Sequence, residues 1–175
     1  SIYDMRPTDC VRFPYMDDDF MLKRQPLALK NSTFCPITYY VIEKLIDTAL
    51  AQLDFSYAPY SGFNVGAALL AKNQAVYTGC NIENAAYTPT NCAERTAFFK
   101  AVSEGVRDFE AICIVGGKNQ KATGYTAPCG VCRQVMMEFC NPKTFKIILA
   151  IDRENYRVYT LEDMLPQGFG PANLE

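Results

Sequence analysis

Hydrophobic residues from Pro36 onward follow two patterns along the chain, a helical spacing and short, mostly apolar runs. The first spacing is helical, with apolar side chains every four residues at Ile37, Val41, Leu45, Ala49 and Leu53. This pattern predicts a helix of about 17 residues that begins at Pro36, a residue type well suited to the first helical position.

Five shorter apolar runs, each bounded by turn residues, predict β-strands. They cover residues 63–70, 75–82, 111–115, 145–151 and 156–161. We expect Gly116 and Gly117 to close the third strand as a turn. These glycines and Lys118 do not predict a phosphate loop, because the spacing and the Ser or Thr of that motif are missing.

Two further helices are predicted at residues 92–104 and 129–140, with a short helical turn near residues 162–165. Gly105 and the pair Asn141-Pro142 are the stop signals for the two longer helices. Helices that alternate with strands pack on the faces of a sheet. The sequence therefore predicts the α/β class, as a three-layer α/β/α sandwich around a central five-stranded mixed sheet.

The first 35 residues have a different character from the rest of the chain. They contain three prolines and the acidic triplet Asp17-Asp18-Asp19, and they sustain neither a helical nor a strand period. We interpret residues 1–35 as an N-terminal extension without an assigned role, and the triplet as a solvated run of charge. Residues 36–175 are then the single folded domain that a chain of 175 residues predicts.

The charge balance and the apolar runs exclude two kinds of partner. Lys and Arg number 17 against 19 Asp and Glu, so the clustered cations that bind a nucleic acid polymer are not expected. The longest apolar runs have five residues, whereas about 20 are needed to cross a bilayer, so no membrane partner is expected either. No segment resembles a secretory signal, and we therefore expect a cytoplasmic protein.

The chain has eight Cys and no His. The absence of His removes the commonest general base and the commonest metal ligand, and it excludes any catalytic triad that depends on His. In a chain without a secretory signal, thiols are more typical of metal binding or catalysis than of a disulfide framework. A metal site in this protein must therefore use thiolates and carboxylates.

The pair Cys129 and Cys132 opens the third predicted helix, within the motif Pro128-Cys129-Gly130-Val131-Cys132. Residues three apart share one helix face, and the unpaired N–H groups and the dipole at a helix start favour the thiolate form. By itself the pair fits a redox dithiol, half of a zinc site or two core cysteines equally well.

A second motif, Cys92-Ala93-Glu94-Arg95, opens the preceding helix. By itself this tetrapeptide favours a buried Cys next to a solvated pair of Glu94 and Arg95. Together, however, the two helix starts can converge at one end of the sheet and supply three thiolates. Catalytic zinc sites have three protein ligands and a water molecule, while structural sites have four. Cys80 is the one remaining candidate for a fourth ligand, and we favour the open, catalytic alternative.

These motifs resemble those of a known family, the zinc-dependent cytidine deaminases of the compact, all-cysteine type. The resemblance covers residues 36–175 and so makes this segment a deaminase-like catalytic domain. The motifs that carry it occur in the family's order: Phe63-Asn64-Val65-Gly66-Ala67-Ala68, Asn81-Ile82-Glu83-Asn84-Ala85-Ala86-Tyr87, Cys92-Ala93-Glu94-Arg95-Thr96-Ala97, Cys132-Arg133-Gln134 and Leu165-Pro166-Gln167-Gly168-Phe169-Gly170-Pro171.

The resemblance implies a role for each residue of the metal site. Three cysteines would bind one Zn²⁺ per subunit: Cys92, Cys129 and Cys132. Glu94 would shuttle protons, in keeping with the general chemistry of zinc deaminases. Arg95 would donate hydrogen bonds to the zinc-bound thiolates.

The resemblance also implies the substrate contacts. Asn81 and Glu83 would bind the ribose hydroxyl, Phe63 would lie against the substrate, and the backbone of Ala93 would contact the base. Three aromatic residues would act across subunit boundaries in a homotetramer with shared active sites: Tyr60, Tyr87 and Phe169. Without the surrounding motifs, Asn81 would be interpreted as a turn residue, Phe169 as a core aromatic and Tyr87 as a residue at a sheet edge.

The implied function is hydrolytic deamination of cytidine and deoxycytidine, a small-molecule reaction of pyrimidine salvage that releases ammonia. Alternatives within the same chemistry are another amino-pyrimidine nucleoside, a nucleoside antibiotic, a nucleotide or a polynucleotide; the pair Asn81 and Glu83 favours a free nucleoside. Alternatives outside it are a redox protein that uses Cys129 and Cys132, and a structural-zinc module that Cys80 would complete.

Overall fold

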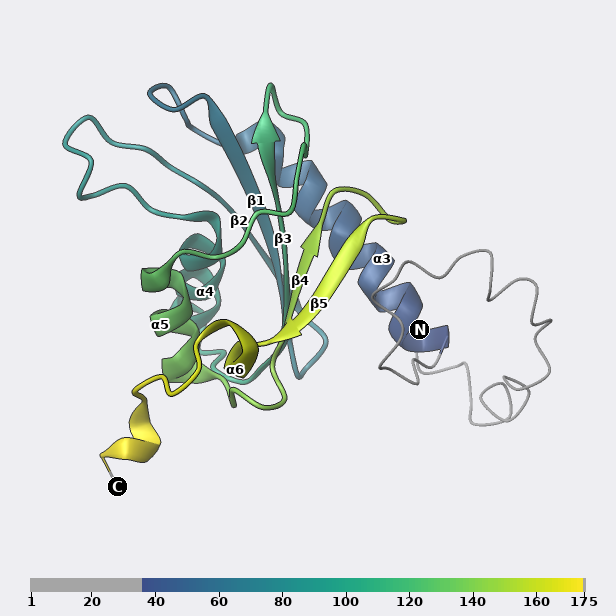
Figure 1. The fold of residues 1–175 in the computed structure, drawn as a ribbon, viewed down its shortest axis with the longest axis vertical. Helices are drawn as coiled ribbons and strands as arrows, with labels where there is room; N and C mark the ends of the chain where they lie inside the picture. The colour runs from purple at the N-terminus through teal and green to yellow at the C-terminus, as the bar shows by residue number, and fades with distance from the viewer. Residues whose placement is uncertain (1–35, 175) are drawn as a thin grey trace.

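The computed structural model describes residues 36–174, with side chains from Tyr40 onward, so the predicted extension of residues 1–35 lies outside the described part. The described elements, in chain order, are α3 (Pro36–Ala51), η4 (Gln52–Phe55), β1 (Phe63–Ala71), β2 (Val76–Cys80), α4 (Ala93–Ser103), β3 (Phe109–Lys118), α5 (Gly130–Phe139), β4 (Lys146–Ala150), β5 (Tyr156–Thr160), α6 (Leu161–Met164) and η5 (Pro171–Asn173) (Figure 1).

The five strands form one mixed sheet in the order β2-β1-β3-β4-β5. Strand β1 pairs antiparallel with both β2 and β3, β3 pairs parallel with β4, and β4 pairs antiparallel with β5. The parallel pair is made possible by α5, which crosses over between β3 and β4. The predicted five-stranded mixed sheet is confirmed.

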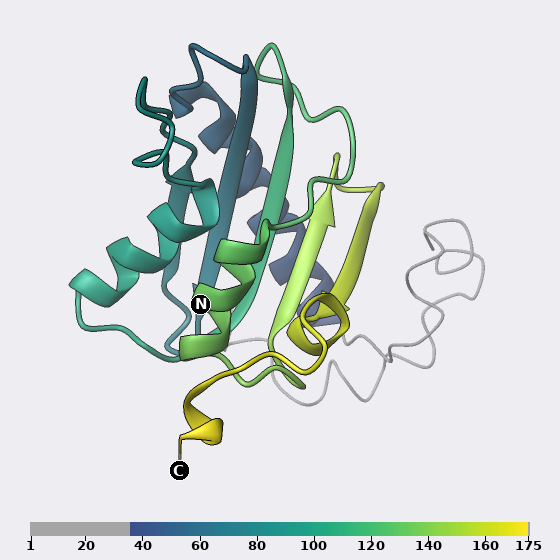
Figure 2. The same cartoon turned by 60° about the vertical axis from the view of Figure 1, so that its left-hand side comes forward.

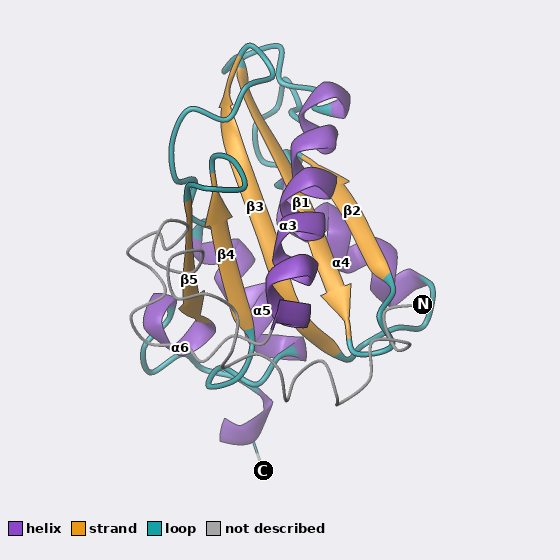
Figure 3. Cartoon of the chain, turned by 90° about the vertical axis from the view of Figure 1, so that its right-hand side faces the viewer, coloured by secondary structure: helices purple, strands orange, loops and turns teal. Residues whose placement is uncertain are grey.

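Helices cover both faces of this sheet. Helix α3 lies on one face, and α4 and α5 lie side by side on the other (Figures 2 and 3). Because side chains alternate along a strand, Ala68 and Leu70 of β1 belong to the α3 core, and Ala67 and Leu69 to the core beneath α4 and α5. The predicted three-layer α/β/α architecture is therefore confirmed.

Helix α4 lies unusually close to β2, at Gly79. A Cβ atom built on Gly79 would lie 2.2 Å from the carbonyl oxygen of Ala93 and 2.6 Å from the backbone nitrogen of Ala97. Only a residue without a side chain allows this approach. Gly79 thereby sets where the first turn of α4 lies relative to the sheet.

The prediction that Gly116 and Gly117 form a turn is wrong. Both glycines lie within β3, which runs to Lys118, and they pair with Val65 and Asn64 of β1. The reason is again close approach, because a Cβ on Gly117 would lie 2.0 Å from the carbonyl oxygen of Lys121. The other elements begin or end within a few residues of the predicted bounds; α3 is a regular helix to Ala51 and continues as η4.

Candidate active site

Two cysteines occupy the N-cap positions of two neighbouring helices on one face of the sheet. Cys92 is the N-cap residue of α4 and Cys129 is the N-cap residue of α5, and both have extended backbone conformations. Each follows a long loop from the sheet, residues 81–91 before α4 and residues 119–128 before α5. The starts of both helices point to the same place, and their dipoles and unpaired N–H groups favour negative charge there.

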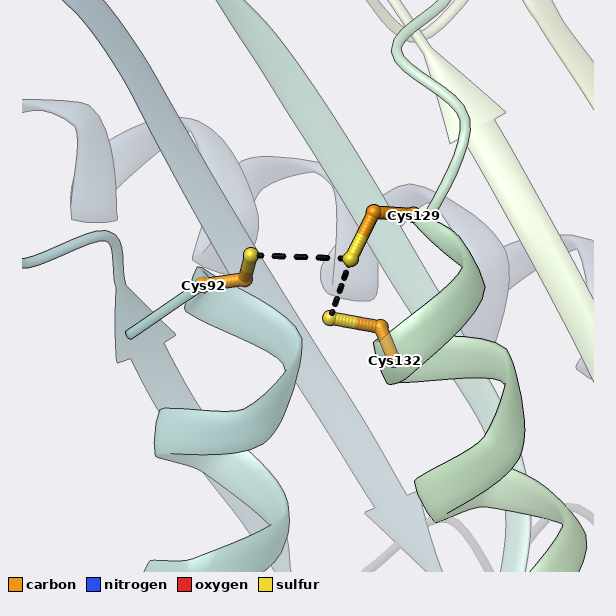
Figure 4. A group of neighbouring side chains, drawn as sticks. All are labelled: Cys92, Cys129 and Cys132. Atoms are coloured by element: carbon orange, nitrogen blue, oxygen red, sulfur yellow. Dashed lines mark hydrogen bonds between the residues drawn. The ribbon is translucent and has the colours of Figure 1, made fainter. Parts of the chain in front are cut away.

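The thiols of Cys92, Cys129 and Cys132 meet between these helix starts (Figure 4). The Sγ atoms of Cys92 and Cys129 are 3.8 Å apart, those of Cys129 and Cys132 are 3.5 Å apart, and all three lie within 4.8 Å of one another. Tetrahedral zinc with Zn–S bonds of about 2.3 Å requires sulfur atoms about 3.8 Å apart. The three thiols therefore fit a zinc ion.

Within the described residues, no fourth Cys, Asp or Glu joins this group. Cys80, the predicted alternative ligand, instead donates a hydrogen bond from its thiol to the carbonyl oxygen of Phe55, 3.3 Å away. Cys113 and Cys140 are buried in the two cores, as expected of small apolar side chains. A set of three protein ligands is typical of a catalytic zinc site, because a fourth position stays open.

The thiols share their protons unequally. Hydrogen bonding with Cys132, helped by Arg95 and Cys129, lowers the pKa of the Cys92 thiol to about 5. The same interaction with Cys92, together with burial, raises the pKa of the Cys132 thiol well above its ordinary value. At least one thiolate is therefore present near neutral pH, which is the form that binds a metal ion.

Glu94 lies in the first turn of α4, directly beside the thiols. It is 4% exposed, and it is the only buried charged residue in the described part of the chain. Burial, with a smaller contribution from Cys92, raises the pKa of its carboxyl group to about 7. The interpretation of Glu94 as a solvated partner of Arg95, which the isolated tetrapeptide favoured, is wrong.

Arg95 brings a positive charge to the thiols. Its Nη2 atom donates to the carbonyl oxygen of Thr90 at 3.0 Å and lies 3.7 Å from the Sγ atom of Cys92. Its Nε atom is buried without a hydrogen-bond partner among the described residues. Three thiolates on a divalent ion carry a net charge of −1, and a guanidinium at this distance offsets it.

The side chain of Asn81 is held rigidly at the end of β2. Its Oδ1 atom accepts hydrogen bonds from the hydroxyl of Ser56 at 2.5 Å and from the backbone N–H of Val65 at 2.8 Å. Its Nδ2 atom donates to the carbonyl oxygen of Phe63 at 2.8 Å. Ser56 could not be predicted from the sequence, because its partner lies 25 residues away along the chain.

Glu83, the second residue of the predicted ribose-binding pair, is oriented by the turn that precedes β1. Its Oε2 atom accepts hydrogen bonds from the backbone N–H groups of Tyr60 at 2.8 Å and Ser61 at 3.2 Å. A further hydrogen bond from the Ser61 side chain is the largest of the effects that lower the pKa of the Glu83 carboxyl group. Glu83 is therefore held as a carboxylate beside this turn.

A cavity of about 340 Å³ lies beside Glu83. Its lining residues are Tyr60, Ser61, Glu83, Asn84, Tyr87 and Thr90. The rings of Tyr60 and Tyr87 are 6.2 Å apart, and both side chains are more than half exposed. Tyr87 lies in a loop with a positive φ of 58°, so its interpretation as a sheet-edge residue is wrong.

The remaining predicted residues occupy different places. Ala93 is fully buried at the start of α4, and Phe63 begins β1 opposite Lys118. Phe169 does not line the cavity; it lies beyond α6 and is 58% exposed, so its interpretation as a core aromatic is wrong. Its carbonyl oxygen accepts a hydrogen bond from Nε2 of Gln134 at 2.9 Å.

Comparisons with known proteins agree with this site. A family model, the cytidine and deoxycytidylate deaminase zinc-binding region, matches residues 40–148. A cytidine deaminase of Sporosarcina psychrophila is 47% identical over 133 residues, which are 76% of this chain and 94% of the relative. One of Halalkalibacterium halodurans is 46% identical over 127 residues, which are 73% of this chain and 92% of the relative.

Solved structures show the same similarity. The crystal structure of cytidine deaminase from Burkholderia pseudomallei superposes with a TM-score of 0.66 at 46% identity, over 72% of this chain and 97% of that one. The enzyme from Mycobacterium tuberculosis superposes with a TM-score of 0.62 at 35% identity, over 73% of this chain and 95% of that one. Fold and site together define a zinc-binding hydrolytic deaminase.

The chain belongs to the cytidine and deoxycytidylate deaminase family, because the family model and these relatives span most of the described residues. None of the described helices has the length and apolar character that crossing a membrane requires.

Proposed function

We propose that this enzyme converts cytidine and deoxycytidine to uridine and deoxyuridine with release of ammonia, using one Zn²⁺ per subunit. The observation that carries the proposal is the convergence of three thiols with one buried carboxyl group at two helix starts. The relatives that are 46–47% identical are named cytidine deaminases, which supports this choice of substrate.

A zinc ion held by the three thiols would act as a Lewis acid and lower the pKa of a bound water molecule. Glu94 would accept a proton from the attacking water and deliver it to N3 of the pyrimidine ring. As the C4–N bond breaks, Glu94 would take the second proton of that water from the oxygen now bonded to C4 and pass it to the leaving amino group, so that ammonia departs and C4 keeps the oxygen as a carbonyl. A buried carboxyl group that exchanges protons near neutral pH suits this role, and the chain has no His to share it.

The remaining site residues would bind and orient the nucleoside. Asn81 and Glu83 would bind the ribose hydroxyl. The turn before β1 orients the Glu83 side chain and the start of β1 orients the Asn81 side chain, so both polar groups are held in place before the substrate binds. Phe63 would lie against the substrate and the backbone of Ala93 would contact the base. Arg95 would act on the thiols rather than on the substrate, since it lies 3.7 Å from Cys92.

The exposed aromatic residues support a homotetramer with shared active sites. Tyr60, Tyr87 and Phe169 are 52%, 75% and 58% exposed, which leaves their rings available to a neighbouring subunit. In the proposed tetramer each would be covered by a neighbouring subunit, with Phe169 reaching the neighbour's base. We further propose a role in pyrimidine salvage in the cytoplasm, consistent with free thiols at all six cysteines that the structure describes.

The test is ammonia release from cytidine and deoxycytidine by the zinc-loaded enzyme. Glu94→Gln should lower kcat by about 10²- to 10⁴-fold while zinc content and fold are retained, as expected of a general acid–base group. Glu104→Gln, an exposed position at the end of the same helix, is the matched control and should retain full activity. Turnover retained by Glu94→Gln would remove Glu94 from the mechanism. No turnover by the folded, zinc-loaded wild type would favour a structural zinc or another amino-pyrimidine substrate.

A nucleotide substrate is the second candidate, because the matched family model also covers deoxycytidylate deaminases. The cavity beside Glu83 is lined by a carboxylate and contains neither Lys nor Arg. A phosphate group near it would be repelled rather than bound. Parallel assays with deoxycytidine and its 5′-monophosphate decide between the two, and the nucleoside should have the higher kcat/KM.

A further inference from the structure

Arg133 follows the zinc-ligand motif directly, yet the proposed chemistry gives it no role. Its guanidinium donates two short hydrogen bonds to backbone carbonyls that belong to separate parts of the chain. The Nε atom donates to Pro128 at 2.7 Å, and Nη1 donates to Met164 at 2.7 Å. Pro128 is the residue before Cys129, and Met164 is the last residue of α6. One half-buried side chain thus joins the start of α5 to the end of α6.

The bond to Pro128 bears on the zinc site because a peptide unit is planar. The carbonyl of Pro128 and the N–H of Cys129 belong to the same plane, so fixing one fixes the direction of the other. Cys129 has no side-chain capping bond of its own in this helix start. The guanidinium of Arg133 therefore orients the peptide from which the Cys129 thiol extends.

The bond to Met164 bears on the C-terminal segment, residues 165–174. Carbonyl groups in the last turn of a helix lack helical partners, and a cation there is favourable. The next residue of α5, Gln134, donates to the carbonyl oxygen of Phe169, and Gly170 lies against Met137, where an added Cβ would be 3.1 Å from Cγ. The segment that carries Phe169 is thus attached to the same helix that carries Cys129 and Cys132 (Figure 1).

We infer that Arg133 is a positioning residue that couples the Cys129 end of the zinc site to the docking of the C-terminal segment. A guanidinium holds its donors in a rigid fork, so it satisfies both carbonyls only when the start of α5 and the end of α6 keep their relative positions. Anything that loosens one of these partners weakens the hold on the other, because such coupling is reciprocal. The inference rests on the proposed function only for the role given to Phe169. The test of the inference does not depend on that function.

The test compares two independent quantities in the zinc-loaded, full-length protein. The first is the rate of zinc release to a chromophoric chelator, and the second is amide hydrogen exchange of residues 165–174. Arg133→Gln should speed zinc release by about tenfold or more, the size of effect typical of groups that orient a metal ligand. It should also speed exchange in residues 165–174, while exchange within β3 stays as in the wild type.

If Arg133→Gln changes only one of the two quantities, the inference is overturned. Faster zinc release with unchanged exchange would make Arg133 a local support of Cys129, and faster exchange with unchanged release would make it an anchor of the segment alone. Arg107→Gln removes an exposed Arg and should change neither quantity.

Arg133→Lys keeps the charge but not the fork, so both quantities should lie between those of the wild type and Arg133→Gln. The same comparison is made with Arg133→Lys if Arg133→Gln does not fold. Neither zinc release nor hydrogen exchange requires turnover, so both results can be interpreted whether or not the ammonia assay succeeds.

Discussion

Ser56 donates a hydrogen bond from its hydroxyl to Oδ1 of Asn81, with the two oxygen atoms 2.5 Å apart. The backbone N–H of Val65 donates to the same oxygen. The acceptor side of the Asn81 amide is therefore fully used inside the protein, and the amide cannot rotate without losing both bonds. Its Nδ2 group is thereby directed to Phe63 and, in the proposed complex, to the ribose.

Replacement of Ser56 by Ala should weaken substrate binding without affecting zinc. The loss of one hydrogen bond that orients Asn81 is worth about 1 kcal/mol, so KM for cytidine should rise by about fivefold at nearly constant kcat. The measurement is steady-state kinetics with zinc content as a check. Ser103→Ala removes a hydroxyl that bonds only within α4 and should leave KM unchanged. An unaltered KM in Ser56→Ala would mean that the orientation of Asn81 does not depend on Ser56.

Three of the cysteines should be required for zinc and Cys80 should not. Cys92→Ser, Cys129→Ser and Cys132→Ser each remove one of the three thiols that meet, so each variant should lose zinc to a chelator under conditions where the wild type keeps it. Cys80→Ser should retain one zinc per chain, because the Cys80 thiol bonds to Phe55 instead. The measurement is metal content after dialysis. Loss of zinc from Cys80→Ser would restore the closed, four-ligand alternative.

Replacement of Gly79 by Ala should destabilise the fold and displace the first turn of α4. The added methyl group would overlap the backbone of Ala93 and Ala97, and overpacking of this kind costs about 3 kcal/mol. The free energy of unfolding in urea measures this loss. Gly124→Ala is the matched control, since a Cβ there meets nothing within 4 Å, and it should change stability by less than about 0.5 kcal/mol. Equal stability of the two variants would show that α4 can move away from β2 without cost.

The contribution of Asp163 to the free energy of unfolding should decrease as the solution becomes acidic. Its carboxylate accepts hydrogen bonds from the hydroxyl and the backbone N–H of Thr160, and these hold the pKa of Asp163 below its ordinary 3.8. Because the folded pKa is lower than the unfolded one, the stabilisation is complete above pH 3.8 and is lost as the pH falls through the folded pKa.

The measurement for Asp163 is the difference in unfolding free energy between the wild type and Asp163→Asn. This difference should be constant from neutral pH to about pH 5 and shrink in more acidic solution. Subtraction removes the acid dependence that both proteins share through the zinc site. Glu162→Gln, which removes the neighbouring carboxyl group and leaves the hydrogen bonds between Thr160 and Asp163 in place, is the control. A difference that grows on acidification would contradict the assigned direction of the pKa shift.

Most of the secondary structure, and the three thiols that come together, could be predicted from the sequence. The four-residue spacing from Val41 to Leu53 and the apolar runs of the strands report on the backbone in which they lie. The N-cap positions of Cys92 and Cys129 are similarly local, because a helix start is defined by a few consecutive residues. By itself the spacing of Cys129 and Cys132 left three interpretations open; the second motif at Cys92 then favoured a zinc site, and the structure brings the three thiols together.

What only the tertiary structure decided concerns segments that are far apart along the chain. The sequence placed no partner beside Ser56, had no role for Arg133 and treated Gly117 as a turn, because the groups that determine these residues lie on other segments. Burial of Glu94 likewise depends on what packs over the first turn of α4, and not on its neighbours in the chain. Local patterns determine which elements form and which side chains a helix start presents. Packing of the layers determines which of those side chains meet, how far water is excluded from them, and hence which protons they hold.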